Sequence, residues 1–104
     1  MRLILKDARP LSHEVQMVST LRYQPGEDVG ARVREVIANV LQVELKVLTP
    51  GARFGEEIDS DSLDLVELVV ELEQVFDIAI NDDDIDGLRT VQDTIRYVEG
   101  RLPH

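Results

Sequence analysis

Apolar residues recur at helical spacing in three separate parts of the chain. In residues 29–41, 62–76 and 90–102, an apolar side chain returns every three or four positions, and charged or polar residues fill the gaps. This period places the apolar side chains of each segment on one face of a helix. The pattern therefore predicts three amphipathic helices, whose core-facing residues are Val29, Val33, Val36, Ile37, Val40 and Leu41 in the first, Leu65, Leu68, Val69, Leu72, Val75 and Phe76 in the second, and Val91, Ile95, Val98 and Leu102 in the third.

Residues that favour helix N-termini stand at the start of each predicted helix. Asp28 directly precedes the first helix, and Thr90 stands at the start of the third, where each can cap its helix. At the start of the second helix, either Asp61 or Ser62 can accept a hydrogen bond from the free amides of the first turn. Asp64 and Glu67 follow near the positive end of the same helix, where a carboxylate is favourable. We expect the second helix to end near Phe76 and Asp77.

The segments between the predicted helices differ in length and composition. Pro50 and Gly51 exclude a helix from the long connection between the first two, and its apolar residues can hold it against the core: Val47, Leu48, Phe54 and Ile58. The acid-rich residues 82–86 predict a short helix or a turn. The expected fold class is all-α: a small antiparallel helical bundle of three main helices plus a short helix or turn, with a long first loop.

A break in the pattern at Pro25-Gly26 divides the chain into two parts. Residues 27–104 hold the predicted helical domain. Residues 1–26 are an N-terminal extension that we expect to be flexible or partly helical. Its helical alternative is capped by Ser12 and places an apolar side at Val15, Val18 and Leu21; Met17 is a second possible start of translation.

Charge narrows the classes of partner. The net charge is −10, and thirteen Asp and Glu with no Lys or Arg stand between Arg53 and Arg89. Such a surface repels phosphate backbones, so no nucleic-acid partner is expected, whereas basic proteins are attracted. Taken alone, the charge favours a simpler interpretation, a solvated and solubilising surface.

Other features of the composition bear on compartment and assembly. The chain has no cysteine, which fits a reducing cytoplasm. No apolar run approaches the roughly 20 residues of a spanning helix, and the apolar part of residues 1–6 is too short for a signal peptide. We expect a cytoplasmic monomer that does not insert into a membrane.

The second helix has more apolar positions than one buried face needs. Leu63, Val66 and Val70 form another stripe beside the predicted core face, and carboxylates stand among them: Glu67, Glu71 and Glu73. An exposed apolar stripe edged by charge is typical of a docking surface. The alternative is a helix that the long loop buries on a second side.

Residues 61–80, DSLDLVELVVELEQVFDIAI, resemble the acyl carrier protein family. The similarity extends from about Arg32 to Arg101 and includes the first and last helices and Phe54. The resemblance implies that Ser62, between Asp61 and Leu63, carries 4′-phosphopantetheine through a phosphodiester. The prosthetic group would come from coenzyme A and would hold acyl intermediates as thioesters in fatty acid, lipid or polyketide biosynthesis. An aminoacyl or peptidyl carrier shares the motif and remains an alternative.

The resemblance implies a carrier rather than an enzyme. Its partners would be a phosphopantetheinyl transferase and acyl-transferring or acyl-modifying enzymes with basic docking surfaces. The residues around Ser62 are the expected docking surface: Asp61, Leu63, Asp64, Val66, Glu67 and Val70. A helix N-terminus also favours the phosphate attached there. The two histidines, His13 and His104, are far from Ser62 in sequence, so a Ser-His-acid triad is not expected.

The sequence departs from the family pattern at several positions. Asp59 and Ser60 stand where many members have glycine and a small apolar residue, Gln42 replaces a frequent glycine after the first helix, and Asn81 replaces a frequent proline. Together with the N-terminal extension, these departures point to a specialised carrier.

Two interpretations from other classes compete with a carrier. Residues 82–93 resemble a calcium loop, with Asp82, Asp84, Asp86 and Asp93 as candidate ligands. However, Arg89 stands at a position that is normally apolar, and Asp93 is shorter than the usual bidentate glutamate. The other competitor is a helical protein-interaction module that keeps this fold without a prosthetic group.

Overall fold

The computed structural model describes residues 22–103, and the elements of regular secondary structure in this range are all helices joined by loops. Its elements are α3 (Val29–Leu41), the 3₁₀ turn η2 (Leu45–Val47), α4 (Ser62–Phe76), α5 (Asp82–Ile85) and α6 (Val91–Arg101). The all-α prediction is confirmed: within residues 22–103 the only β pairing consists of two isolated bridges. The helix predicted from Ser12 and the possible start at Met17 lie outside the described residues.

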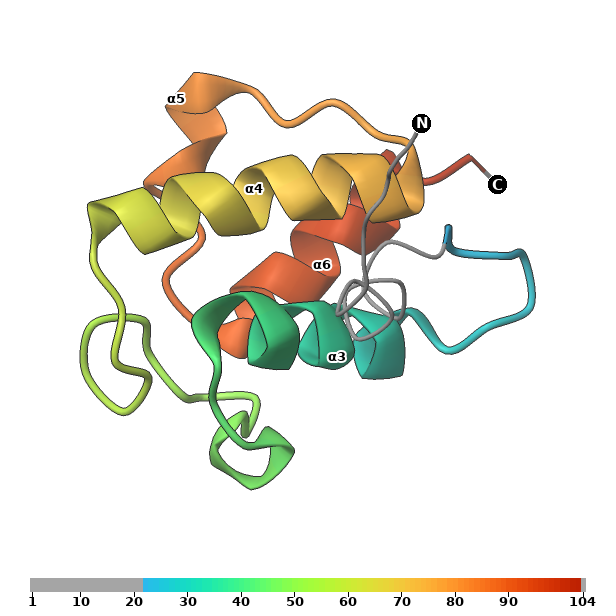
Figure 1. The fold of residues 1–104 in the computed structure, drawn as a ribbon. Helices are drawn as coiled ribbons and strands as arrows, with labels where there is room; N and C mark the ends of the chain where they lie inside the picture. The colour runs from blue at the N-terminus through green and yellow to red at the C-terminus, as the bar shows by residue number, and fades with distance from the viewer. Residues whose placement is uncertain (1–21, 104) are drawn as a thin grey trace, which may run out of the picture.

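The three long helices form the predicted antiparallel bundle. Helices α3 and α4 lie side by side and run in opposite directions, and α6 packs against α3 behind them (Figure 1). The short helix α5 lies above the first turns of α4 in this view. Both ends of the described chain lie at the opposite end of the bundle, beyond the last turn of α4 (Figure 1).

The core is aliphatic, as the low aromatic content requires. Its most deeply buried side chains come from all three helices: Val33, Val36, Ile37, Leu72, Val75, Val91 and Val98. The predicted positions Val29, Val40, Leu41, Leu65, Ile95 and Leu102 are only partly buried and pack around the edge of this core. The pattern missed Thr94, which is 1% exposed. Its hydroxyl donates to the Thr90 carbonyl at 3.0 Å, which satisfies the buried polar group.

The long loop between α3 and α4 is held down as predicted at Leu48 and Ile58, and Phe54 is partly buried. The prediction for Val47 was wrong, because this side chain is exposed. Arg34 fixes the short turn by donating to the carbonyls of Leu45 (2.8 Å) and Leu48 (3.1 Å). This turn is too short to direct two neighbouring side chains to the core, and Leu48, at its C-terminal end, is the one that is buried.

Salt is expected to raise the melting temperature of this bundle. The thirteen carboxylates between Arg53 and Arg89 repel one another most strongly in the folded state, and physiological ionic strength screens charges over about 8 Å. Thermal melts followed by circular dichroism in increasing NaCl, or in millimolar MgCl₂, check this. A melting temperature that stays constant or falls with both salts would contradict it.

Candidate functional site

The start of α4 is built by a reciprocal pair of hydrogen bonds. The Asp61 carboxylate accepts from the Asp64 amide at 2.9 Å, and the Asp64 carboxylate accepts from the Asp61 amide at 3.0 Å. This capping box satisfies amides that a helix start otherwise leaves unpaired. Of the two caps that the sequence allowed, Asp61 is the one used, and Ser62 is the first residue of the helix.

Ser62 is exposed, and no protein hydrogen bond reaches its hydroxyl in the part of the chain that the structure describes. Because Asp61 caps the helix, the Ser62 hydroxyl is not needed for folding. The unpaired amides and the dipole of α4 favour a negative group attached here. The site therefore combines an accessible nucleophilic oxygen with a favourable position for a phosphodiester.

The neighbouring serine has a different environment. Ser60 is half-buried, and its hydroxyl donates to the Ile58 carbonyl at 3.3 Å. The same loop is fixed further upstream, where the Arg53 amide donates to the Glu57 carboxylate at 2.9 Å. This hydrogen bond lowers the pKa of Glu57 below its ordinary value. The loop thus presents Ser62 and holds Ser60 against its own backbone.

A hollow of about 320 Å³ adjoins Ser62. Its walls come from the long loop, α4, α5 and the segment before α6: Arg53, Phe54, Glu56, Ser62, Leu65, Val66, Ile85, Asp86, Leu88 and Arg89. A small void of about 10 Å³ lies further in and shares four apolar residues with it: Phe54, Leu65, Ile85 and Leu88. The hollow therefore leads from the serine toward the core. Its residues outside α4 were missed by sequence analysis.

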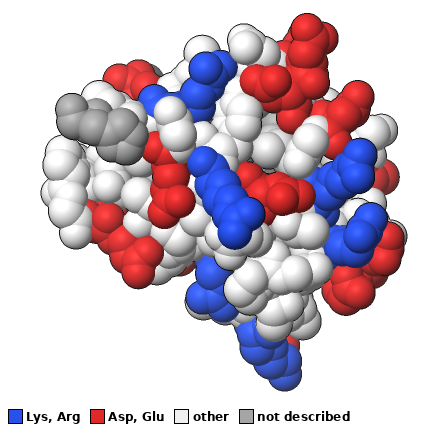
Figure 2. Space-filling view, turned by 180° about the vertical axis from the view of Figure 1, so that it is seen from behind, with Lys and Arg blue, Asp and Glu red and all other residues white. Residues whose placement is uncertain are grey.

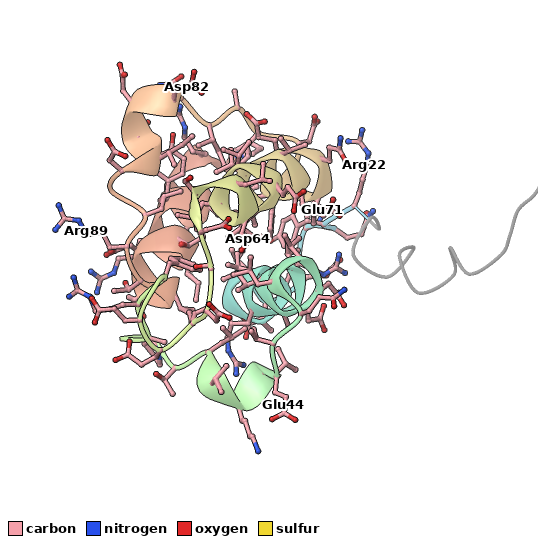
Figure 3. The ribbon with its side chains drawn as sticks, turned by 60° about the vertical axis from the view of Figure 1, so that its left-hand side comes forward. Arg22, Glu44, Asp64, Glu71, Asp82 and Arg89 are labelled. Atoms are coloured by element: carbon pink, nitrogen blue, oxygen red, sulfur yellow. The ribbon has the colours of Figure 1, made fainter. Side chains whose placement is uncertain are left out.

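A long-range backbone contact explains why these residues come together. Arg53 and Thr90 form an antiparallel bridge, and the Phe54 amide donates to the Arg89 carbonyl at 3.0 Å. Arg53 and Arg89, which stand at the two ends of the acidic stretch in the sequence, therefore line the same hollow. Figure 3 shows Arg89 projecting outward from this side of the molecule.

The second apolar stripe of α4 is exposed. Leu63, Val66 and Val70 are 65%, 50% and 45% exposed, so the long loop does not bury this side of the helix. Among the carboxylates, Glu67 is exposed, whereas Glu73 accepts a hydrogen bond from the Ile80 amide at 2.8 Å and holds the next loop. Figure 3 shows Asp64 near the start of α4 and Glu71 further along the helix.

Basic side chains do not gather on the other side of the molecule. Figure 2 shows the face seen from behind, where Lys and Arg are interspersed with Asp and Glu. The structure also contains exposed ion pairs, such as Arg53 with Glu56 at 3.1 Å. Exposed pairs of this kind contribute little to stability.

Two of the candidate calcium ligands have structural partners. Asp84 accepts a hydrogen bond from the Tyr97 hydroxyl at 2.6 Å, and Asp93 forms a capping box with Thr90 at the start of α6. Partial desolvation raises the pKa of Tyr97, and the bond to Asp84 raises it further. Asp82 and Asp86 are exposed. Within residues 22–103, no group of three or more His, Cys, Asp or Glu is arranged to hold a metal ion.

Replacing Asp61 with alanine is expected to destabilise the protein by about 1 kcal/mol, because the cap and its reciprocal bond to Asp64 are lost. Urea unfolding measures this change. Ser60→Ala is the matched control, since it removes only a 3.3 Å bond within the loop, and it should stay within about 0.5 kcal/mol of the wild type. Equal losses in the two variants would contradict the assignment of Asp61 as the cap.

Comparison with known families agrees with this geometry. The family model described as phosphopantetheine attachment site matches residues 31–98, and the chain belongs to this family. It is therefore a carrier domain with covalently attached 4′-phosphopantetheine, and it is not an enzyme. Its partner enzymes include a phosphopantetheinyl transferase. Across residues 22–103, the helices are too short or too polar to cross a bilayer.

Proposed function

We propose that Ser62 is the attachment residue of this carrier. The observation that supports it is the exposed, unpaired hydroxyl at the first position of α4, beside an open hollow. During loading, the Ser62 oxygen attacks the phosphorus next to the pantetheine of coenzyme A. The new Oγ–P bond replaces the bond to 3′,5′-ADP, which leaves, and the hydroxyl proton passes to a base of the transferase. The positive end of α4 then faces the phosphodiester.

We further propose that the cargo is an acyl chain, carried as a thioester for enzymes of fatty acid, lipid or polyketide biosynthesis. The apolar inner wall of the hollow supports this proposal, since Phe54, Leu65, Ile85 and Leu88 offer an alkyl chain shelter from water. A polar aminoacyl group would bury less apolar surface in this hollow and would be stabilised less. The absence of cysteine fits work in the reducing cytoplasm.

An acyl arm is expected to contact the hollow, and an aminoacyl arm is not. The protein is loaded by a phosphopantetheinyl transferase with octanoyl-coenzyme A or with glycyl-coenzyme A, and amide chemical shifts are compared. The octanoyl form should shift the amides of Leu65, Ile85 and Leu88 relative to the glycyl form, while those of Leu45 and Lys46 serve as controls. Equal spectra would contradict acyl cargo, whereas the gain of mass at Ser62 tests attachment separately.

The proposed docking surface for partner enzymes surrounds Ser62. Leu63, Val66 and Val70 supply an exposed apolar centre, and Asp61, Asp64 and Glu67 supply negative charge around it. A transferase must bring its active site to Ser62, so its own surface has to cover this part of α4. The matching surface is expected to be basic with an apolar patch at its centre.

A further inference from the structure

A hollow larger than the one beside Ser62 lies at the other end of α4. It has a volume of about 630 Å³, at the end of the bundle where the last turn of α4, the segment before α3 and the end of α6 meet (Figure 1). Its walls are mostly apolar, formed by Tyr23, Pro25, Val29, Phe76, Leu102 and Pro103. Glu99 is the one charged residue that lines it within residues 22–103. We call this hollow the distal groove.

The wall formed by the segment before α3 is firmly held. The Tyr23 amide donates to the Val75 carbonyl at 2.7 Å, and the Tyr23 ring packs on Phe76 with centroids 5.1 Å apart. The Tyr23 hydroxyl donates to the Glu27 carbonyl at 3.3 Å, and the Gln24 amide donates to the Glu27 carboxylate at 2.8 Å. The distal groove is therefore a built feature of the fold rather than a gap beside a loose end.

We propose that residues 11–21 of this chain dock in the distal groove. Consecutive Cα atoms are about 3.8 Å apart, so Leu21 stands two such steps from Tyr23, which lines the groove. This tether gives residues 11–21 a high effective concentration at the groove, and no separate molecule has that advantage.

The chemistry of residues 11–21 matches the groove. Leu11, Val15, Val18 and Leu21 recur at helical spacing, which would place four aliphatic side chains on one side of a helix about 16 Å long. This side would cover the apolar walls and remove them from water. Glu14 is three residues after Leu11 and four before Val18, so it falls on the same side and its carboxylate would have to reach the rim. His13, Gln16 and Thr20 would face away from the groove.

Charge attracts the N-terminal residues as a whole to the bundle but does not select the groove. Residues 1–21 have a net charge of +1, from Arg2, Lys6 and Arg9 against two acids, and residues 22–104 have a net charge of −11. The extension is therefore attracted to the acidic bundle over distances of about a Debye length. Residues 11–21 contain no Lys or Arg, so their contact with the groove rests on apolar burial. Docking at this end leaves Ser62, at the other end of α4, open to partner enzymes.

Paramagnetic relaxation enhancement tests the proposal on the full-length chain. The protein has no cysteine, so Gln16→Cys provides a single site for a nitroxide label, on the side of the predicted helix opposite Val15 and Val18. The amides of Gly26, Glu99 and Leu102 should be broadened. Those of Gly55 and Asp61, near Ser62, should not.

Matched variants separate docking from the mere proximity of a tether. Val15→Asp with Val18→Asp places two charges on the apolar side and should abolish the broadening at Glu99 and Leu102. His13→Asp with Thr20→Asp adds the same charge on the opposite side of the helix and should preserve the broadening. Loading of Ser62 at the wild-type rate shows that each variant is folded.

Three results would overturn the proposal: broadening that survives the valine substitutions, broadening lost equally in the His13 and Thr20 control, or no broadening in the wild type. The last measurement uses a mixture of two proteins: ¹⁴N protein that carries the nitroxide, and ¹⁵N protein without a nitroxide, whose amides are observed. Broadening in this mixture would identify a second copy as the occupant, which also contradicts docking within one chain.

Discussion

Ser62→Ala is expected to abolish attachment of phosphopantetheine and to leave the bundle folded. The Ser62 hydroxyl is the proposed nucleophile, and its removal leaves no oxygen at the first position of α4. Folding should hardly change, because Asp61 still caps the helix and alanine is a better helix former than serine. The melting temperature therefore reports an intact fold independently of loading.

The measurement is the intact mass after incubation with a phosphopantetheinyl transferase and coenzyme A. Ser60→Ala is the control, and it should be loaded like the wild type, because the Ser60 hydroxyl is directed to the Ile58 carbonyl. A gain of mass in the Ser62→Ala variant would sink the assignment. So would a wild-type protein that gains no mass, since no other result could then support attachment at this serine.

Val66→Asp is expected to slow loading by about ten- to a hundredfold, which corresponds to about 1.4 to 2.7 kcal/mol. Val66 is 50% exposed, lies on the stripe next to Ser62 and lines the hollow beside it. A partner that covers this position would have to bury an unpaired carboxylate. Because the side chain is half exposed in the free protein, the substitution should not unfold the bundle.

The same change elsewhere on the surface is a matched control. Val47 is also exposed but lies in η2, away from the start of α4 (Figure 1). Val47→Asp should load at nearly the wild-type rate. Loading rates that fall equally in both variants would show that added negative charge alone is responsible. A Val66→Asp variant that loses its circular dichroism signal would mean that the stripe contributes to the core.

Glu67→Lys tests whether negative charge speeds the approach of the transferase, separately from apolar contact at Val66. Glu67 is exposed at the edge of the stripe, and charges at the edge of an interface act mainly on the association rate. Loading should slow less than in Val66→Asp, and its dependence on salt should become weaker. These kinetic differences distinguish the charged margin of the docking surface from its apolar centre.

Local patterns in the sequence were enough to predict the three helices. Helical periodicity is a property of neighbouring residues, and the predicted ranges agree with α3, α4 and α6 because capping residues lie at their starts: Asp28, Asp61 and Thr90. The exposed stripe of Leu63, Val66 and Val70 was also readable, since one helix face cannot hold every apolar residue of α4. The serine motif pointed to Ser62 for the same reason, because its residues are contiguous.

Tertiary structure alone decided the features that join distant parts of the chain. The bridge between Arg53 and Thr90 brings two walls of the hollow beside Ser62 together. No local sequence pattern predicts a contact between residues 37 positions apart. The burial of Thr94 depends on packing between distant segments, because Thr94 lines one small void with Phe54 and Leu65 from other segments. The choice of Asp61 as the cap is local, but it needed actual hydrogen-bond geometry. Tyr23 falls in the predicted extension, yet it packs on Phe76 and lines the distal groove. Periodicity shows which side of a helix is apolar, but what covers that side depends on packing between segments far apart in sequence.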